Sequence, residues 1–187
     1  MNPVNATTAA LLSIALPFLA ACGNEPPAAK AGAQQAATAA TAAPSPALPE
    51  GLVVRGPANG THVAAAKAAA RQGEEITIVG RIGGSANPYV ADRAIFTIVD
   101  PALKACSDMD DPDHCDKPWD YCCEDRAKLR AGTATIEIAG ADGKPIAVAV
   151  RGVQGLDPLV TVAVTGTVTE RNDAGLLVVR AKRIEVR

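Results

Sequence analysis

Four cysteines in a short acidic stretch are the residues of this sequence whose types and spacing best suit chemistry. They follow the pattern C-x8-C-x6-C-C and are Cys106, Cys115, Cys122 and Cys123. Residues 106–125 also carry eight acidic side chains, with Lys117 as the only basic one. Because thiolates and carboxylates bind metal ions and paired thiols can oxidise, the stretch predicts either disulfides or a metal site.

Disulfides are the first interpretation, because four is an even number and the chain begins with an export signal, described below. A bond between the adjacent Cys122 and Cys123 would close a strained ring. The remaining arrangements pair Cys106 and Cys115 with these two residues, and either would clamp a loop that has little hydrophobic core of its own. The spacing leaves the pairing open.

A metal site is the second interpretation. The four thiols, together with His114, are soft ligands suited to zinc or copper, although the C-x2-C arms of zinc knuckles are missing. Calcium fits less well, because Pro112 follows Asp108 and Asp110 where a calcium-binding loop places Asp or Asn. A thiol oxidoreductase is disfavoured, because the neighbouring carboxylates raise thiol pKa values.

Two aromatic and two basic residues are candidates for ligand binding. Trp119 and Tyr121 lie within the cysteine stretch, where they can either cover the cysteines or stack on a ligand. Arg180 and Lys182 lie in a basic run near the C-terminus. The run PWDYCC at 118–123 resembles a motif of uncharacterised secreted proteins of planctomycete-type bacteria, and this resemblance implies no activity.

Motifs typical of catalysis are missing from the sequence. It has no H-E-x-x-H, no phosphate-binding glycine loop and no dinucleotide fingerprint, and His62 and His114 are its two histidines. An enzyme is therefore less expected than a binding protein. A net charge of -2 and an aromatic content of 3% also argue against nucleic acid as a partner.

The N-terminus predicts export and a lipid anchor. Residues 11–21 form an apolar run too short to span a bilayer and typical of a signal peptide. The following Leu19-Ala20-Ala21-Cys22 resembles the lipobox of bacterial lipoproteins. The resemblance implies that residues 1–21 are removed, that Cys22 is acylated, and that the protein faces the periplasm from the outer membrane. Because residues 1–10 contain no Lys or Arg, a non-lipidated signal peptide is the alternative.

Residues 22–49 are rich in Ala and Pro and predict a disordered tether. Residues 50–187 predict the folded domain. We expect a helix at 60–72, with Thr61 as its N-cap and Gly73 as its stop, and a hairpin or kinked strand at 141–150. Alternating apolar residues predict strands at 76–82, 94–99, 133–138, 160–169 and 176–186.

The strand sequences resemble a known barrel. GEEITIVGRI, RAIFTIVD and VAVTGTVTERNDAGLLVVRAKRIEV are similar to the first, second and last two strands of the oligonucleotide/oligosaccharide-binding (OB) fold. This resemblance implies a mainly β, five- to six-stranded OB-like barrel with one N-terminal helix, in which Gly80 or Gly166 lets a strand bend. The Cys-rich loop at 101–126 would be an insertion. An antiparallel sandwich is the alternative fold.

Two functions remain after these exclusions. The first is a membrane-anchored, non-catalytic binding or scaffold module of the cell envelope, stabilised by disulfides and contacting a glycan or another protein. The second is a periplasmic metal-binding protein that uses the Cys/His/Asp loop to store, sense or deliver zinc or copper.

Overall fold

The structure is a computed structural model that describes residues 47–110 and 115–187. The predicted signal peptide, Cys22, most of the tether and His114 lie outside the described residues. No helix within the described ranges is long and apolar enough to cross a bilayer.

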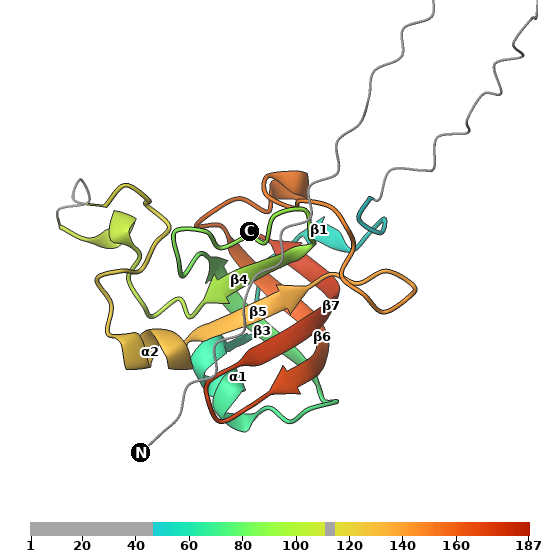
Figure 1. Cartoon of the computed structure of the whole chain (residues 1–187), viewed down its shortest axis with the longest axis horizontal. Coiled ribbons are helices and arrows are strands. Elements are labelled where there is room, and N and C mark those ends of the chain that lie inside the picture. The colour runs from blue at the N-terminus through green and yellow to red at the C-terminus, as the bar shows by residue number, and fades with distance from the viewer. Residues whose placement is uncertain (1–46, 111–114) are drawn as a thin grey trace, which may run out of the picture. The chain divides into compact units, whose positions relative to one another are not determined.

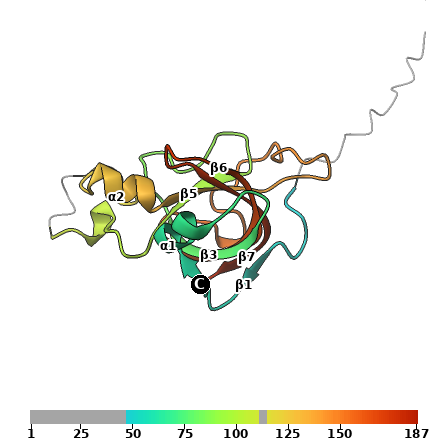
Figure 2. The same cartoon turned by 90° about the horizontal axis from the view of Figure 1, so that it is seen from below.

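Five strands form a closed barrel (Figures 1 and 2). They are β3 (Glu75–Ile82), β4 (Ile95–Val99), β5 (Thr133–Glu137), β6 (Thr161–Arg171) and β7 (Leu177–Val186). Neighbouring strands run antiparallel, except that β5 and β7 are parallel, and the pairing of β3 with β6 closes the barrel. The predicted mainly β, OB-like barrel is therefore confirmed.

Alternation along the strands separates the barrel interior from its surface. The inward side chains are large and aliphatic or aromatic, and those that are fully buried include Ile78, Ile82, Phe96, Ile98, Ile136, Val164, Val179 and Ile184. The intervening threonines, such as Thr165 on β6 and Thr77 on β3, are half-buried and share a hydrogen bond of 2.9 Å between their hydroxyls. One face of each strand thus builds the core.

Two glycines let strands of the barrel approach each other closely. A Cβ at Gly166 would collide with the carbonyl oxygen of Arg180, at a place where the β6–β7 register shifts. A Cβ at Gly80 would lie 2.9 Å from the carbonyl oxygen of Val99. Both positions therefore need a residue without a side chain, which agrees with the expected bends.

The N-terminal part adds two short strands and a helix. β1 (Val53–Arg55) pairs in parallel with β7, and β2 (Thr61–His62) pairs in parallel with β3. Helix α1 (Val63–Ala69) places Val63 and Ala66 in the barrel core and lies across one end of the barrel (Figure 2).

The predicted helix at 60–72 was thus too long at both ends. Thr61 is not an N-cap, because its backbone pairs with Ile78 of β3. At the other end, Ala70 has extended backbone angles, and the amide of Gly73 already donates to the carbonyl of Val168 at 2.8 Å. Pairing with the barrel outweighs the helical propensity of the flanking residues.

Two further expectations were wrong in detail. The segment at 141–150 forms no strand, but its turn makes the short hairpin that was one of the two expected forms. Ala139 bridges to Pro145, and the amide of Ile146 donates to the carbonyl of Ile138 at 3.0 Å. The apolar Ile146 and Val148 both pack against the core, which explains their alternation, but the amide of Val148 donates only to the nearby Ile146. The structure also has a second helix, α2 (Arg126–Ala131), whose N-cap Asp125 accepts from the amides of Ala127 and Lys128.

The buried Lys67 connects three segments. Its ammonium donates to the carbonyl oxygens of Arg130 and Gly175, each at 2.7 Å, and to that of Thr133. One side chain on α1 thereby holds the end of α2, the start of β5 and the β6–β7 loop. Burial lowers the pKa of Lys67 to about 8.

Candidate metal centre

The cysteine stretch lies in the connection between β4 and β5, beside the barrel (Figure 1). This connection has a small apolar core of its own. Tyr121 and Ala105 are buried against Val99 at the end of β4, with Leu103 and Leu129 packed around them. The insertion is therefore attached to the barrel through apolar contacts that involve no cysteine.

Backbone hydrogen bonds draw the two halves of the insertion together. The short helix η1 (Cys106–Asp108) begins at the first cysteine. The amide of Cys106 donates to the carbonyl of Asp120 at 2.8 Å, and the amide of Ser107 donates to that of Pro118 at 3.0 Å. These two bonds place Cys106 opposite the segment that carries the later cysteines.

An ion pair links the insertion to the barrel wall. The guanidinium of Arg81, on β3, donates to the carboxylate of Asp108 at the end of η1. The same carboxylate accepts from the amide of Ala105 at 3.0 Å. Although burial opposes it, the hydrogen bond from Arg81 holds the pKa of Asp108 below its usual range. The acidic stretch thus folds onto a basic residue of the barrel, as the attraction between opposite charges favours.

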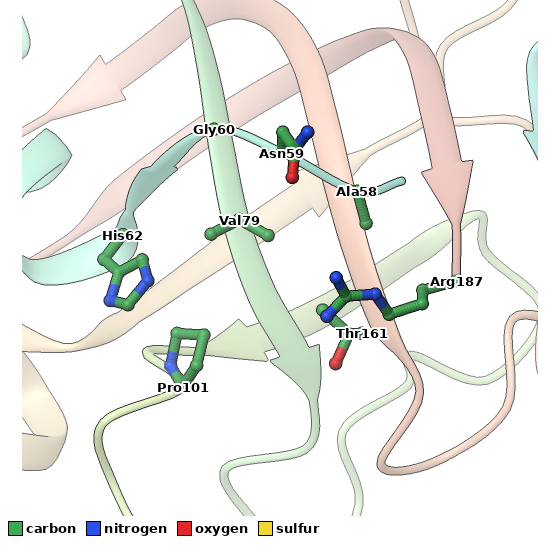
Figure 3. Close-up of a pocket in the computed structure, with 8 residues that line it drawn as sticks. All are labelled: Ala58, Asn59, Gly60, His62, Val79, Pro101, Thr161 and Arg187. Carbon is green, nitrogen blue, oxygen red and sulfur yellow. The ribbon is translucent and has the colours of Figure 1, made fainter. Parts of the chain in front are cut away.

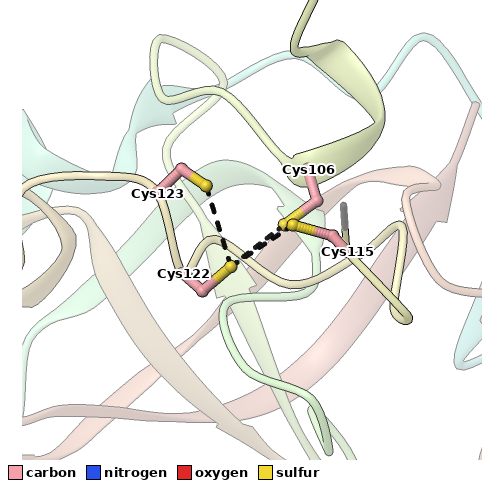
Figure 4. A group of neighbouring side chains, drawn as sticks. All are labelled: Cys106, Cys115, Cys122 and Cys123. Carbon is pink, nitrogen blue, oxygen red and sulfur yellow. Dashed lines mark hydrogen bonds between the residues drawn. The ribbon is translucent and has the colours of Figure 1, made fainter. Parts of the chain in front are cut away.

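The four cysteine sulfurs converge on one point, as Figure 4 shows. All four Sγ atoms lie within 4.8 Å of one another. The Sγ of Cys122 is 3.4 Å from that of Cys106, 3.4 Å from that of Cys115 and 3.8 Å from that of Cys123. The fold therefore brings together the four cysteines that the sequence singled out.

These separations fit a metal ion bound by four thiolates. With metal–sulfur bonds of about 2.3 Å, the sulfurs of a tetrahedral zinc site are about 3.8 Å apart. The distances of 3.4 and 3.8 Å around Cys122 are close to this value, including the distance to the adjacent Cys123. The missing C-x2-C arms are consequently no obstacle, and the cluster can hold a metal ion.

Contacts among the thiols shift their acidities in opposite directions. Hydrogen bonds from Cys106, Cys115 and Cys123 lower the pKa of the Cys122 thiol. Burial raises the pKa of the Cys106 thiol, and hydrogen bonding with Cys106 raises that of Cys115. Among these three, Cys122 is the first to become a thiolate, and a bound cation would favour the others as thiolates as well.

The same geometry also suits two disulfides. Cys122 has both Cys106 and Cys115 at 3.4 Å, so a modest movement would bring either sulfur to the bonded distance of about 2.05 Å. Each choice leaves the other cysteine to pair with Cys123, within the 4.8 Å that encloses the cluster. The predicted pairings of Cys106 and Cys115 with the adjacent cysteines are both geometrically open.

The exposure of the sulfurs is uneven. Cys106 is buried, Cys115 is half-buried, and Cys122 and Cys123 are exposed. A hollow of about 310 Å³ opens beside Cys115 and Cys122, and it is also lined by Ala86, Asp116, Lys117 and Asp120. The cluster thus has a closed side at Cys106 and an open side at the hollow.

The two candidate aromatic residues have different surroundings. Tyr121 is buried in the core of the insertion, and its hydroxyl has no hydrogen-bond partner among the described residues. Trp119 is half-buried: its Nε1 donates to the carbonyl of Ala86 at 3.1 Å, and the Arg151 guanidinium lies 4.8 Å from its ring centroid. Trp119 therefore contacts the hollow only through Ala86, which lines it, while Tyr121 anchors the insertion.

The two candidate basic residues lie on β7, apart from the cysteines. Lys182 is exposed and forms an ion pair with Glu75 of β3. Arg180 is half-buried, and its Nε is buried without a hydrogen-bond partner among the described residues. The structure thus does not gather Arg180 and Lys182 with Trp119 into one site.

A second hollow, of about 250 Å³, was not anticipated from the sequence (Figure 3). His62 and Arg187 lie on opposite sides of Val79 in this hollow. The Nδ1 of His62 is 3.5 Å from a carboxylate oxygen of the buried Asp100, which also accepts from the amides of Ala64 and Ala102 at 2.9 Å. Sequence reasoning missed this pair because the two residues are far apart in the chain.

Comparisons with known proteins give a distant structural likeness. No family model and no curated protein matches the chain. A solved structure, described as that of the hypothetical protein YgiW from E. coli, has a TM-score of 0.36 and 16% sequence identity. The match covers 72% of this chain and 97% of that one.

Proposed function

We propose that this protein is a metal-binding module of the cell envelope, whose four-cysteine cluster holds zinc or copper(I). The convergence of four sulfurs within 4.8 Å carries the proposal. Thiolates are soft ligands, and a site made of four of them selects zinc or copper(I) over calcium or magnesium. The barrel serves as the scaffold on which the insertion is mounted.

Charge also favours a cation in this cluster. Thiolates crowded to 3.4–3.8 Å repel one another unless a positive charge lies between them. Asp116 and Asp120, beside the cluster, add to the negative potential. A bound metal ion would relieve this repulsion and would also protect the thiols from oxidation in an oxidising compartment.

Metal analysis and a thiol count on one sample test the proposal. The full-length chain is extracted from the envelope without chelator, and its zinc and copper are measured together with its reactive thiols. We expect close to one ion per chain, with four cluster thiols that become reactive only after a chelator is added. Absence of metal from protein purified and then reloaded under reducing conditions would contradict the proposal.

Matched variants separate the cluster from its surroundings. Cys106→Ser and Cys122→Ser each remove one sulfur and should lower the zinc affinity strongly, since structural zinc contributes about 10–16 kcal/mol of apparent binding free energy. Ser107→Ala, next to Cys106, changes no sulfur and should bind zinc like the unaltered chain. Equal affinity in all three variants would show that the metal is held elsewhere.

The second candidate is a non-catalytic binding or scaffold module stabilised by disulfides. The distance of 3.4 Å from Cys122 to both Cys106 and Cys115 favours it, because oxidation needs little movement. The same experiment decides between the two: no metal and no reactive thiols without reductant indicates disulfides. Mass spectrometry of the unreduced protein then gives the pairing.

The cellular location is part of the proposal and depends on the sequence alone. The lipobox-like residues before Cys22 support export and acylation. We propose that the barrel is held near the membrane by this lipid and the Ala/Pro-rich tether. Its metal would then be exchanged with other components of the envelope.

A further inference from the structure

The open side of the cysteine cluster suggests how a bound metal ion leaves. Structural zinc sites are closed and contribute to folding, whereas sites that react keep an open position. Here Cys115 and Cys122 both line the hollow of about 310 Å³, while Cys106 is buried behind them. An incoming ligand can approach two of the four sulfurs without any movement of the barrel.

The insertion around the cluster is held by contacts that use no sulfur. The insertion is held by the packing of Tyr121 and Ala105 against Val99 and by the Arg81–Asp108 ion pair. The bonds from Cys106 and Ser107 to the opposite segment use backbone atoms. Loss of the ion therefore does not require loss of the fold, in contrast to small zinc domains that unfold without metal.

The rim of the hollow has a negative character. Asp116 and Asp120 line it with Lys117 as a single opposing charge, and thiolates at Cys115 and Cys122 would add to the negative side. Such a rim raises the local concentration of cations and favours an acceptor with a basic surface. It also disfavours polycarboxylate ligands.

We propose that this cluster is a transfer site, which passes its metal ion through the hollow to the thiol ligands of an acceptor protein. This inference rests on the proposed function. An acceptor thiol loses its proton as its sulfur forms a bond to the metal, and the bond to Cys122 or Cys115 breaks. The acceptor's proton goes to the departing thiolate, and the oxidation state of the metal is unchanged. Cys106, on the closed side, is the last ligand to leave.

Exchange kinetics test the transfer. The full-length chain is loaded with zinc and mixed with increasing concentrations of 2,3-dimercaptopropanol, an uncharged dithiol probe that the negative rim does not repel, while zinc release and far-UV circular dichroism are recorded. We expect a release rate that rises with dithiol concentration, with an unchanged barrel spectrum. A rate independent of dithiol concentration would overturn the proposal, because release would then be limited by opening of a closed site.

A variant that narrows the hollow sharpens the test. Ala86→Phe places a large side chain on its rim, and we expect release to slow by about fivefold while the equilibrium zinc affinity stays within about twofold. Ala102→Phe, an exposed alanine of the same insertion away from the hollow, is the matched control and should exchange normally. Equal release rates in the two variants would contradict exchange through the hollow.

The two proposals fail in distinguishable ways. If the chain binds no metal at equilibrium, the proposed function is wrong and the transfer site with it. If it binds one ion that is released at a rate independent of the dithiol, the metal site remains and its role in transfer is wrong.

Discussion

Lys67 shows how a single residue can hold distant parts of this chain together. Its ammonium donates to three carbonyl oxygens, from α2, β5 and the β6–β7 loop. We expect Lys67→Met to lower the free energy of unfolding by about 2 kcal/mol, because the carbonyls lose their donor in a place of little water. Denaturant unfolding of this variant beside Lys182→Met, which removes only an exposed ion pair, measures the difference.

The pH dependence of that difference provides a check. Burial lowers the pKa of Lys67 to about 8, whereas the pKa of a lysine in an unfolded chain is about 10.4. Between these values the unfolded chain binds the extra proton, so this group's contribution to stability rises as the pH rises. The free energy of unfolding of the unaltered chain, taken from denaturation curves, should therefore increase relative to that of Lys67→Met between pH 8 and pH 10. A constant offset would indicate that the ammonium stays charged.

Asp108 makes the docking of the insertion sensitive to acid. Because Arg81 holds its pKa below the usual range, its contribution is present above about pH 4 and is lost as the pH falls through the lower, folded value. The side chains are partly exposed, so Asp108→Asn should cost about 1 kcal/mol or less. We expect weaker protection of the Cys106 amide, relative to the intrinsic exchange rate at the same pH and followed by NMR, in this variant and in the unaltered chain at pH 3.

The ion pair between Arg171 and Asp173 is the matched control for Asp108. The Asp173 side chain is fully exposed, and the pair spans a single loop. Asp173→Asn should leave the exchange of the Cys106 amide unchanged at neutral pH. If Asp108→Asn and Asp173→Asn both increase the exchange of the Cys106 amide equally, the change follows from the altered net charge and not from loss of docking.

At the scale of elements, β6 can bend only because Gly166 has no side chain. We expect Gly166→Ala to lower the free energy of unfolding by about 2–3 kcal/mol, since its methyl group would meet the Arg180 backbone, which cannot rotate away. Thermal unfolding compares it with Gly140→Ala, where the nearest atom, a side-chain oxygen of Asp142, is 3.4 Å from the added carbon. Similar melting temperatures would mean that the β6–β7 register adjusts to the methyl group.

The sequence predicted the five barrel strands because their alternation reflects burial on one side. It overestimated the length of paired backbone at 141–150, where Ile146 belongs to a short hairpin and Val148 packs against the core without joining a strand. It also failed for short elements that depend on contacts with the rest of the fold. Thr61 has the residue type of a helix N-cap but pairs with Ile78. Helix α2 was missed because its six residues are too few to give a helical pattern and depend on their cap at Asp125.

The candidate site was predictable in its members but not in its form. Thiol chemistry follows from the residue types at Cys106, Cys115, Cys122 and Cys123. Their convergence depends on the bond between Cys106 and Asp120 and on the burial of Tyr121, which are set by packing and not by local propensity. For the same reason the partner of Asp108, Arg81 on β3, has no signal in the sequence.

For the whole molecule, we predict that the proposed lipid anchor at Cys22 and the proposed metal site act independently. We expect Cys22→Ala to move the protein from the membrane fraction to the soluble envelope fraction, because the acyl chains provide the anchoring. Fractionation followed by immunoblotting measures this, and the purified variant should bind zinc as the unaltered chain does. An unchanged membrane fraction would show that the chain is held by a partner or an uncleaved signal.

The position of β7 has a consequence for how the chain acquires its fold. One edge of β7 pairs with β6 along its length, while the other edge pairs first with β5 and then with β1. The strands β1, β5 and β6 therefore all need the ten residues of β7 to complete their pairing. In a chain that emerges N-terminus first, from a ribosome or from a translocation channel, the barrel stays open until this last segment has arrived. Such late closure of the barrel keeps the polypeptide unfolded while it moves through the ribosome exit or a translocation channel, and tertiary structure forms only afterwards.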